Sequence, residues 1–212
     1  RSFHLPKKNI LLEPEGRNTA PAILWAACRI HRLDPEAVMA VLPSDHLIRH
    51  PGRFSKDLQR ALQLAREGYL VTLGVVPNRP ETGFGYLKTR RVKDHRKSIL
   101  KVEQFTEKPS LKTAQRFLKE KRYLWNSGMF AWKTEAILDA CKKFLPDFYR
   151  LLIDKTDSAS VQKIWHRLPA ISVDYGILQK AANVVTIPAS GIGWSDLGSW
   201  QALWECLPKD GR

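Results

Sequence analysis

Residues 37–76, AVMAVLPSDHLIRHPGRFSKDLQRALQLAREGYLVTLGVV, decide the fold class. The continuous apolar run Ala37–Leu42 predicts a strand buried on both faces, and Tyr69–Val76 predicts a second strand. Between them, apolar residues at helical spacing predict a helix that begins near Phe54 and ends at Gly68. Strand, helix and strand in this order are typical of a parallel sheet covered by helices.

The flanking segments extend this pattern in both directions. Upstream, Asn9–Leu12 predicts a short strand, and a helix capped by Asn18 or Thr19 follows. Downstream, the expected elements are strands or hairpin arms at 86–92, 99–105, 123–133 and 184–188 and helices at 110–118, 134–144, 146–153, 158–167, 172–182 and 199–206. We therefore expect one α/β domain over residues 1–212, with a mostly parallel Rossmann-like sheet flanked by helices.

The composition is that of a soluble globular protein. The chain has 212 residues, of which 43% are hydrophobic and 26% charged, and no apolar stretch approaches the roughly 20 residues that span a bilayer. The first residues do not resemble a secretory signal. Cys28, Cys141 and Cys206 lie far apart, which indicates free thiols and a cytoplasmic location. A membrane protein or a disulfide scaffold is therefore not expected.

The formal net charge of +14 favours partners that carry phosphate groups. The densest basic run, Lys88–Lys97, is interpreted as a solvated hairpin tip, with a nucleic-acid-binding arm as the alternative. No aromatic side chain in this run offers a stacking platform for bases. We therefore expect phosphorylated small molecules as partners rather than nucleic acid.

Two aspartates stand where predicted strands give way to loops. Asp45 lies in Leu42–His46, and Asp196 lies in the glycine-flanked stretch Gly193–Trp200. Two carboxylates from distant segments can share one Mg²⁺ and leave its other positions to phosphate oxygens and water. Each aspartate alone is equally typical of a turn or a helix cap. His46 is interpreted as a supporting residue, because no nucleophile motif accompanies it.

Three further segments combine glycine with polar side chains. Glu13–Pro21 offers a glycine and a helix N-terminus to an anion or a purine base, or forms only a capped turn. Glu81–Tyr86 with Glu107–Pro109 can face a sugar phosphate, or form an ordinary hairpin entry. Asn126 interrupts an apolar strand and needs a hydrogen-bond partner, which a sugar hydroxyl or the backbone can supply.

These segments together closely resemble the mannose-1-phosphate guanylyltransferase family. The matching stretches, in the family's order, are EPEGRNTAPA (13–22), LPSDH (42–46), PETGFGYL (80–87), FTEKP (105–109), WNSGMF (125–130), SVDYGILQK (172–180) and GWSDLGSW (193–200). The resemblance spans nearly the whole chain. It implies transfer of GMP from GTP to mannose 1-phosphate, giving GDP-mannose and pyrophosphate, with Mg²⁺ as cofactor.

The resemblance also implies a role for each matching residue. The nucleotide would be bound by Glu13, Gly16, Arg17, Asn18 and Thr19. The catalytic residues would be Asp45, Lys108 and Asp196, of which the two aspartates bind the metal and Lys108 meets the sugar phosphate. The mannose would be bound by Gly85, Glu107, Asn126 and Asp174, with Lys180 near its phosphate.

One departure from the family pattern concerns the start of the chain. The family's glycine-rich phosphate loop and first strand have no match here, so we expect an N-terminally and C-terminally truncated core with its N-terminal strands missing. Such a chain is expected to have little transferase activity alone, and its incomplete sheet would favour a homodimer. Alternatives are a non-catalytic, sugar-nucleotide-binding or regulatory relative, and a nucleotidyltransferase for another hexose 1-phosphate.

Overall fold

The computed structural model describes residues 4–91, 99–155 and 157–207, which fall into two compact units. The first unit contains Arg1–Met39 and Lys133–Ala182, and the second contains Ala40–Trp132 and Asn183–Arg212. The single domain expected over residues 1–212 stays a prediction.

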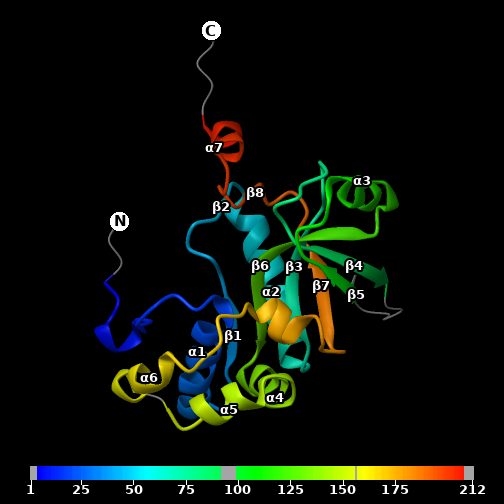
Figure 1. Cartoon of the computed structure of the whole chain (residues 1–212). Helices are drawn as coiled ribbons and strands as arrows, with labels where there is room; N and C mark the ends of the chain where they lie inside the picture. Colours follow the sequence, from blue (N-terminus) through cyan, green and yellow to red (C-terminus); the bar gives the residue numbers. More distant parts are fainter. Residues whose placement is uncertain (1–3, 92–98, 156, 208–212) are drawn as a thin grey trace. The chain divides into compact units, whose positions relative to one another are not determined.

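The first unit is helical (Figure 1). Its elements are η1 (Lys7–Asn9), α1 (Thr19–Leu33), α4 (Thr134–Phe144), α5 (Pro146–Leu152), α6 (Ser158–Trp165) and the π-helical turn η2 (Asp174–Leu178). Helix α1 begins where predicted, because Asn18 Oδ1 accepts the Thr19 N–H at 2.8 Å. It packs against α4 and α5. In the core, Trp25 and Trp165 meet edge to face at 5.7 Å between ring centroids.

Two predictions in this unit are wrong. Asn9–Leu12 forms no strand: η1 ends at Asn9, and Ile10 and Leu12 are 45% and 72% exposed, so the apolar run finds no sheet to join. The helix expected over 172–182 is confined to η2. Its buried residues end at Leu178, and the polar residues beyond it have no apolar face to bury.

The second unit is built around a sheet. Its elements are β2 (Leu47–Ile48), α2 (Pro51–Arg66), β3 (Leu70–Val75), β4 (Tyr86–Arg91), β5 (Leu100–Thr106), α3 (Leu111–Glu120), β6 (Tyr123–Lys133), β7 (Val184–Pro188), β8 (Trp194–Ser195) and α7 (Trp200–Cys206), while β1 (Val38–Val41) leads into it. The strand order is β1-β6-β3-β7-β5-β4, and β4 also pairs with the start of β6. Strands β2 and β8 form a separate small sheet.

The α/β class with flanking helices is confirmed, but the expected direction of strand pairing is wrong for most neighbours. Among the described registers of the large sheet, β3 and β7 are parallel and lie side by side in Figure 1. The pairs β3–β6, β4–β5, β4–β6 and β5–β7 are antiparallel. The reason is that β4 and β5 form a hairpin and β6 returns against β3, which makes these neighbours antiparallel.

Burial and packing in the second unit correct one prediction and agree with others. Strand β1 is not buried on both faces, since Met39 is buried and Ala40 is exposed. Helix α2 packs on β3 and β7, as its apolar spacing predicted. Under α3, Phe117 stacks on Tyr123 at 3.9 Å between centroids, within a cluster that includes Trp125. The hairpin of β4 and β5 is confirmed, whereas residues 92–98 of the basic run lie outside the described residues.

Candidate functional site

The small β2–β8 sheet brings the two aspartate segments together. Leu47 pairs with Ser195 and Ile48 with Trp194 in antiparallel register. The pairing places Asp45 and Asp196, which are far apart in sequence, at the same end of this ladder. The Asp45 side chain is 81% exposed, so its carboxylate is accessible to a ligand.

His46 directly follows Asp45 and lies at the same end of the β2–β8 ladder as Asp196. Trp194 Nε1 donates to His46 Nδ1 at 3.1 Å, which leaves the proton of the neutral ring on Nε2, 4.0 Å from Asp45 Oδ1. Burial lowers the pKa of His46, and the negative charges of Asp45 and Asp196 offset part of that effect. Both carboxylates therefore lie close enough to one imidazole for their charges to act on it.

The loop around Asp196 has an unusual backbone. Leu197 has a φ of 52°, in the left-handed region that non-glycine residues rarely adopt. A Cβ on Gly198 would lie 2.5 Å from Asp196 Oδ2. A side chain at position 198 would therefore force the Asp196 carboxylate to move.

Three of the residues predicted to bind the sugar come together in the second unit, and we call them the sugar cluster: Gly85, Glu107 and Asn126. A Cβ on Gly85 would lie 2.6 Å from Glu107 Oε2, so the carboxylate rests on the glycine. The Asn126 N–H donates to the Gly85 carbonyl at 2.8 Å, and Asn126 Oδ1 accepts from Thr72 Oγ1 at 2.9 Å. The cluster thus presents a carboxylate and an amide on one face of β4 and β6.

Glu107 and Lys108 lie directly beyond β5. Burial raises the pKa of Glu107, and the positive charge of Lys108 opposes that shift. Lys108 has a φ of 42°, and its N–H donates to the Phe84 carbonyl at 3.2 Å. Its side chain is exposed and can meet a phosphate group.

The predicted nucleotide loop, residues 13–19, is fixed to the segment 165–173 within the first unit. Trp165 Nε1 donates to the Glu15 carbonyl at 2.8 Å, and Arg17 Nη1 donates to the Leu168 carbonyl at 2.6 Å. Arg17 also pairs with Glu15, so the arginine is not merely solvated. Thr19 Oγ1 accepts the N–H of Val173 at 3.0 Å.

Within this loop the predicted residues differ in what they can offer a nucleotide. Glu13 and Gly16 are exposed. Asn18 has a φ of 64° and caps α1. Because all three nitrogens of the Arg17 guanidinium contact Glu15 or Leu168, a nucleotide would have to share Arg17 with these partners.

Asp174 and Lys180 belong to the first unit, unlike the sugar cluster. Asp174 begins η2 and is partly buried, and its carbonyl accepts the Gln179 N–H at 2.9 Å. Lys180 follows η2 and is exposed. Their proposed contacts with a sugar phosphate stay predictions.

Sequence reasoning missed a cavity of about 250 Å³ beside Asp196. Its lining includes the aromatic residues Phe84, Trp125 and Trp194 and the charged residues Arg49, Arg79 and Glu205. The three aromatic residues stand inside stretches that the sequence had singled out for other residues. No motif marks the three charged residues, because each comes from a separate polar segment.

Within the described residues, each helix is too short or too polar to cross a bilayer. Nor do those residues contain a group of three or more His, Cys, Asp or Glu side chains placed to hold a metal ion.

Relatives of known sequence are similar over the whole chain. A mannose-1-phosphate guanylyltransferase of Escherichia coli is 40% identical over 221 residues, which cover 100% of this chain and 47% of that relative. The xanthan biosynthesis protein XanB of Xanthomonas campestris pv. campestris (strain B100) is 40% identical over 220 residues, which cover 96% of this chain and 44% of that relative. The chain thus spans about half the length of these curated relatives.

Solved structures and a family model agree with this similarity. A Thermus thermophilus protein named mannose-1-phosphate geranyltransferase matches with a TM-score of 0.84 at 34% identity, covering 94% of this chain and 58% of that one. A Helicobacter pylori mannose-6-phosphate isomerase matches with a TM-score of 0.73 at 30% identity, covering 87% of this chain and 74% of that one. The family model described as nucleotidyl transferase matches residues 3–212. The chain therefore belongs to the nucleotidyl transferase family.

Proposed function

We propose that this chain is the nucleotidyltransferase part of a longer mannose-1-phosphate guanylyltransferase. It would transfer GMP from GTP to mannose 1-phosphate and release GDP-mannose and pyrophosphate. The observation that carries the proposal is the β2–β8 pairing, which places Asp45 and Asp196 at the same end of one ladder. The names of the relatives support the choice of GTP and mannose 1-phosphate as substrates.

The two aspartates fit a magnesium ion by their chemistry. Both offer carboxylate oxygens, which Mg²⁺ prefers, and Mg²⁺ is commonly held by one or two carboxylates together with substrate phosphates. When bound, the ion would supply charge that offsets the repulsion between two phosphorylated substrates. His46 donates no metal ligand in this proposal, and its Nε2 lies 4.0 Å from Asp45 Oδ1.

The chain's own residues would bind and align the substrates. Glu107 can accept hydrogen bonds from sugar hydroxyls, and Asn126 can both donate and accept them. Lys108 can place a positive charge at the phosphate of the sugar. Alignment of the attacking phosphate oxygen with the α-phosphorus of GTP needs no covalent intermediate with the protein. We further propose a cytoplasmic location, in keeping with three free cysteines.

The test is calorimetric titration of the chain with GDP-mannose, with and without Mg²⁺. We expect Mg²⁺ to tighten binding in the wild type, and the variants Asp45→Asn and Asp196→Asn to lose that enhancement while still binding GDP-mannose without metal. Asp139→Asn, which changes an exposed aspartate on α4, is the matched control. No binding of GDP-mannose, or an enhancement that survives both substitutions, would refute the proposal.

The same titration separates the alternatives. Tighter binding of UDP-glucose than of GDP-mannose would favour a nucleotidyltransferase for another hexose 1-phosphate. Binding of GDP-mannose with no effect of Mg²⁺ would favour a regulatory relative that only binds the sugar nucleotide. The homodimer expected from the sequence stays a prediction, which sedimentation of the chain tests.

A further inference from the structure

The loop that leads into β4 is held by one carboxylate. Glu81 Oε1 accepts the N–H groups of Thr82 and Gly83, each at 3.0 Å. The Tyr86 hydroxyl donates to the Glu81 carbonyl at 2.8 Å. The loop ends at Gly85 of the sugar cluster, whose carbonyl accepts the Asn126 N–H at 2.8 Å.

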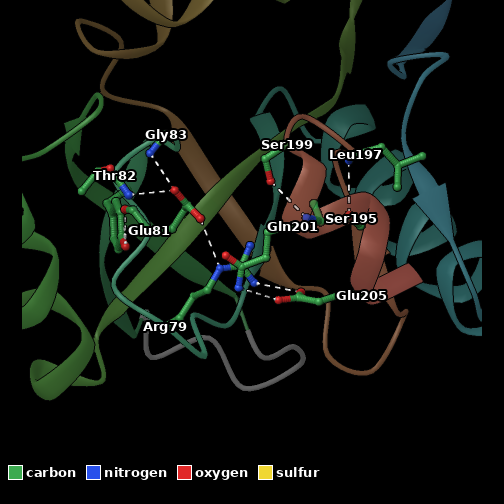
Figure 2. A network of polar contacts seen from close by, with 11 residues as sticks. Arg79, Glu81, Thr82, Gly83, Ser195, Leu197, Ser199, Gln201 and Glu205 are labelled. Atoms are coloured by element: carbon green, nitrogen blue, oxygen red, sulfur yellow. Dashed lines mark hydrogen bonds and ion pairs between the residues drawn. The ribbon is translucent and has the colours of Figure 1, made fainter. Parts of the chain in front are cut away.

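Arg79 is the cation that faces this carboxylate, as Figure 2 shows. Its Nε donates to Glu81 Oε2 at 3.1 Å, and its Nη1 lies 3.7 Å from Glu205 Oε2. Its guanidinium also stands over the Trp125 ring, 5.4 Å from the centroid. Burial raises the pKa of Glu81, but hydrogen bonds from Gly83 and Arg79 outweigh burial, and the net pKa is lowered. The Glu81 carboxylate is therefore held in its ionised form by these donors.

Glu205 on α7 is itself fixed from two sides. Arg49 Nη2 donates to the Glu205 carbonyl at 3.1 Å, and Gln201 Nε2 donates to Glu205 Oε1 at 3.1 Å. Arg49 directly follows β2, and its N–H donates to the Gly193 carbonyl at 3.2 Å. Glu205 thus joins the strand pair that carries the aspartates to the loop that carries Gly85.

Arg79 lies on the opposite side of the sheet from the sugar cluster. It stacks on Trp125, whereas the cluster contains Asn126, the next residue in β6. Consecutive residues of a strand point to opposite faces. Arg79 therefore does not contact a sugar bound at the cluster, and any effect it has on that sugar acts through the loop.

We propose that Arg79 and Glu205 are positioning residues for the sugar site, which hold loop 81–85 so that Gly85 and Glu107 keep their binding arrangement. The inference rests on the proposed function for the identity of the sugar ligand. It adds two residues that no motif contains.

The experiment is calorimetric titration of the whole chain with GDP-mannose and with GDP, both with Mg²⁺. Arg79→Ala should weaken binding of GDP-mannose about tenfold, the cost typical of losing hydrogen bonds to a charged group, and leave GDP binding within about twofold. Glu205→Gln keeps the shape of the side chain and should weaken the binding of GDP-mannose about twofold, the effect expected from losing a partly exposed ion pair. Arg90→Ala is the matched control, because Arg90 pairs with Glu103 at 2.8 Å elsewhere on the same sheet.

Hydrogen exchange supplies a second measurement that needs no ligand. The Thr82 and Gly83 amides should exchange about tenfold faster in Arg79→Ala than in the wild type, while amides of β3 keep their protection. Equal GDP-mannose affinity in the wild type and Arg79→Ala overturns this inference alone. Equal weakening of GDP-mannose and GDP binding also overturns it, since that result indicates either a direct contact of Arg79 with the nucleotide in the cavity beside Asp196 or a general loss of structure. If the wild type binds no GDP-mannose, both the proposed function and this inference fail.

Discussion

Replacing Gly85 with alanine tests whether the sugar cluster depends on the close contact between its glycine and Glu107. The added Cβ would lie 2.6 Å from Glu107 Oε2 and 2.8 Å from Phe105 Cζ. Gly85 is not among the residues with positive φ, so alanine fits the backbone and only the contacts are affected. The substitution therefore moves the Glu107 carboxylate while leaving the chain path possible.

The structure sets the size of the effect. Ordinary contact begins at 3.4 Å, so the carboxylate must move by about 0.8 Å. A misplacement of about 1 Å in a binding group costs up to about a hundredfold in activity, and we expect GDP-mannose to bind about ten- to a hundredfold more weakly. The Phe105 ring must also shift, and such overpacking lowers the free energy of unfolding by about 1–3 kcal/mol.

Calorimetric titration measures the affinity, and urea unfolding measures the stability. Gly52→Ala is the control, because a Cβ on Gly52 meets no atom within 4 Å. It should bind like the wild type and be no less stable. If Gly85→Ala binds GDP-mannose as tightly as the wild type, Glu107 does not act through the position that Gly85 gives it, and the reasoning is refuted.

Three further substitutions test other parts of the structure. Glu107→Gln should become more stable relative to the wild type as the pH rises, because burial raises the folded-state pKa of Glu107 above 4.5. The loss of stability that the ionised Glu107 causes in the wild type is absent below about pH 4.5 and grows as the pH passes through the raised pKa. Urea unfolding at about pH 4 and 7 measures the difference. Lys121→Gly should raise the free energy of unfolding by about 0.5–1 kcal/mol, because Lys121 ends α3 with a φ of 51°; an unchanged or lower midpoint of urea unfolding would contradict this. Trp165→Phe should lower the free energy of unfolding by about 1–3 kcal/mol, since the substitution removes the 2.8 Å hydrogen bond to the Glu15 carbonyl and leaves a gap beside Trp25. Equal stability of the variant and the wild type would show that the nucleotide loop does not depend on this bond.

The sequence predicted most helices and central strands because local patterns determine them. The Asn18 cap, the Ser110 cap of α3 and the run Leu70–Val75 each carry their signal within a few residues. The predictions failed where a distant partner decides the outcome. Asn9–Leu12 is apolar enough for a strand but has no neighbouring strand in the described residues, and the direction of β6 depends on where the chain turns, which no local pattern records.

In the candidate site, too, local patterns predicted single residues but not the contacts between distant segments. Asp45 and Asp196 could be singled out one by one, but their meeting depends on β2 and β8, two-residue strands that are too short to have a detectable period. Arg79 and Glu205 gave no signal, because an arginine and a glutamate in polar segments are most often solvated surface residues. Whether the isolated chain lacks transferase activity stays a prediction.

The β2–β8 pairing also has a consequence for the order in which the molecule folds. His46 and Trp194, which meet at this pairing, are 148 residues apart, and closing such a loop in the unfolded chain costs about 4 kcal/mol of entropy. The β3–β7 pair lies inside this loop and shortens it once formed, so the two aspartates come together after the large sheet. We therefore expect the β2–β8 pairing to open before the β3–β7 pairing, and a ligand that bridges the aspartates to slow that opening while the large sheet stays folded.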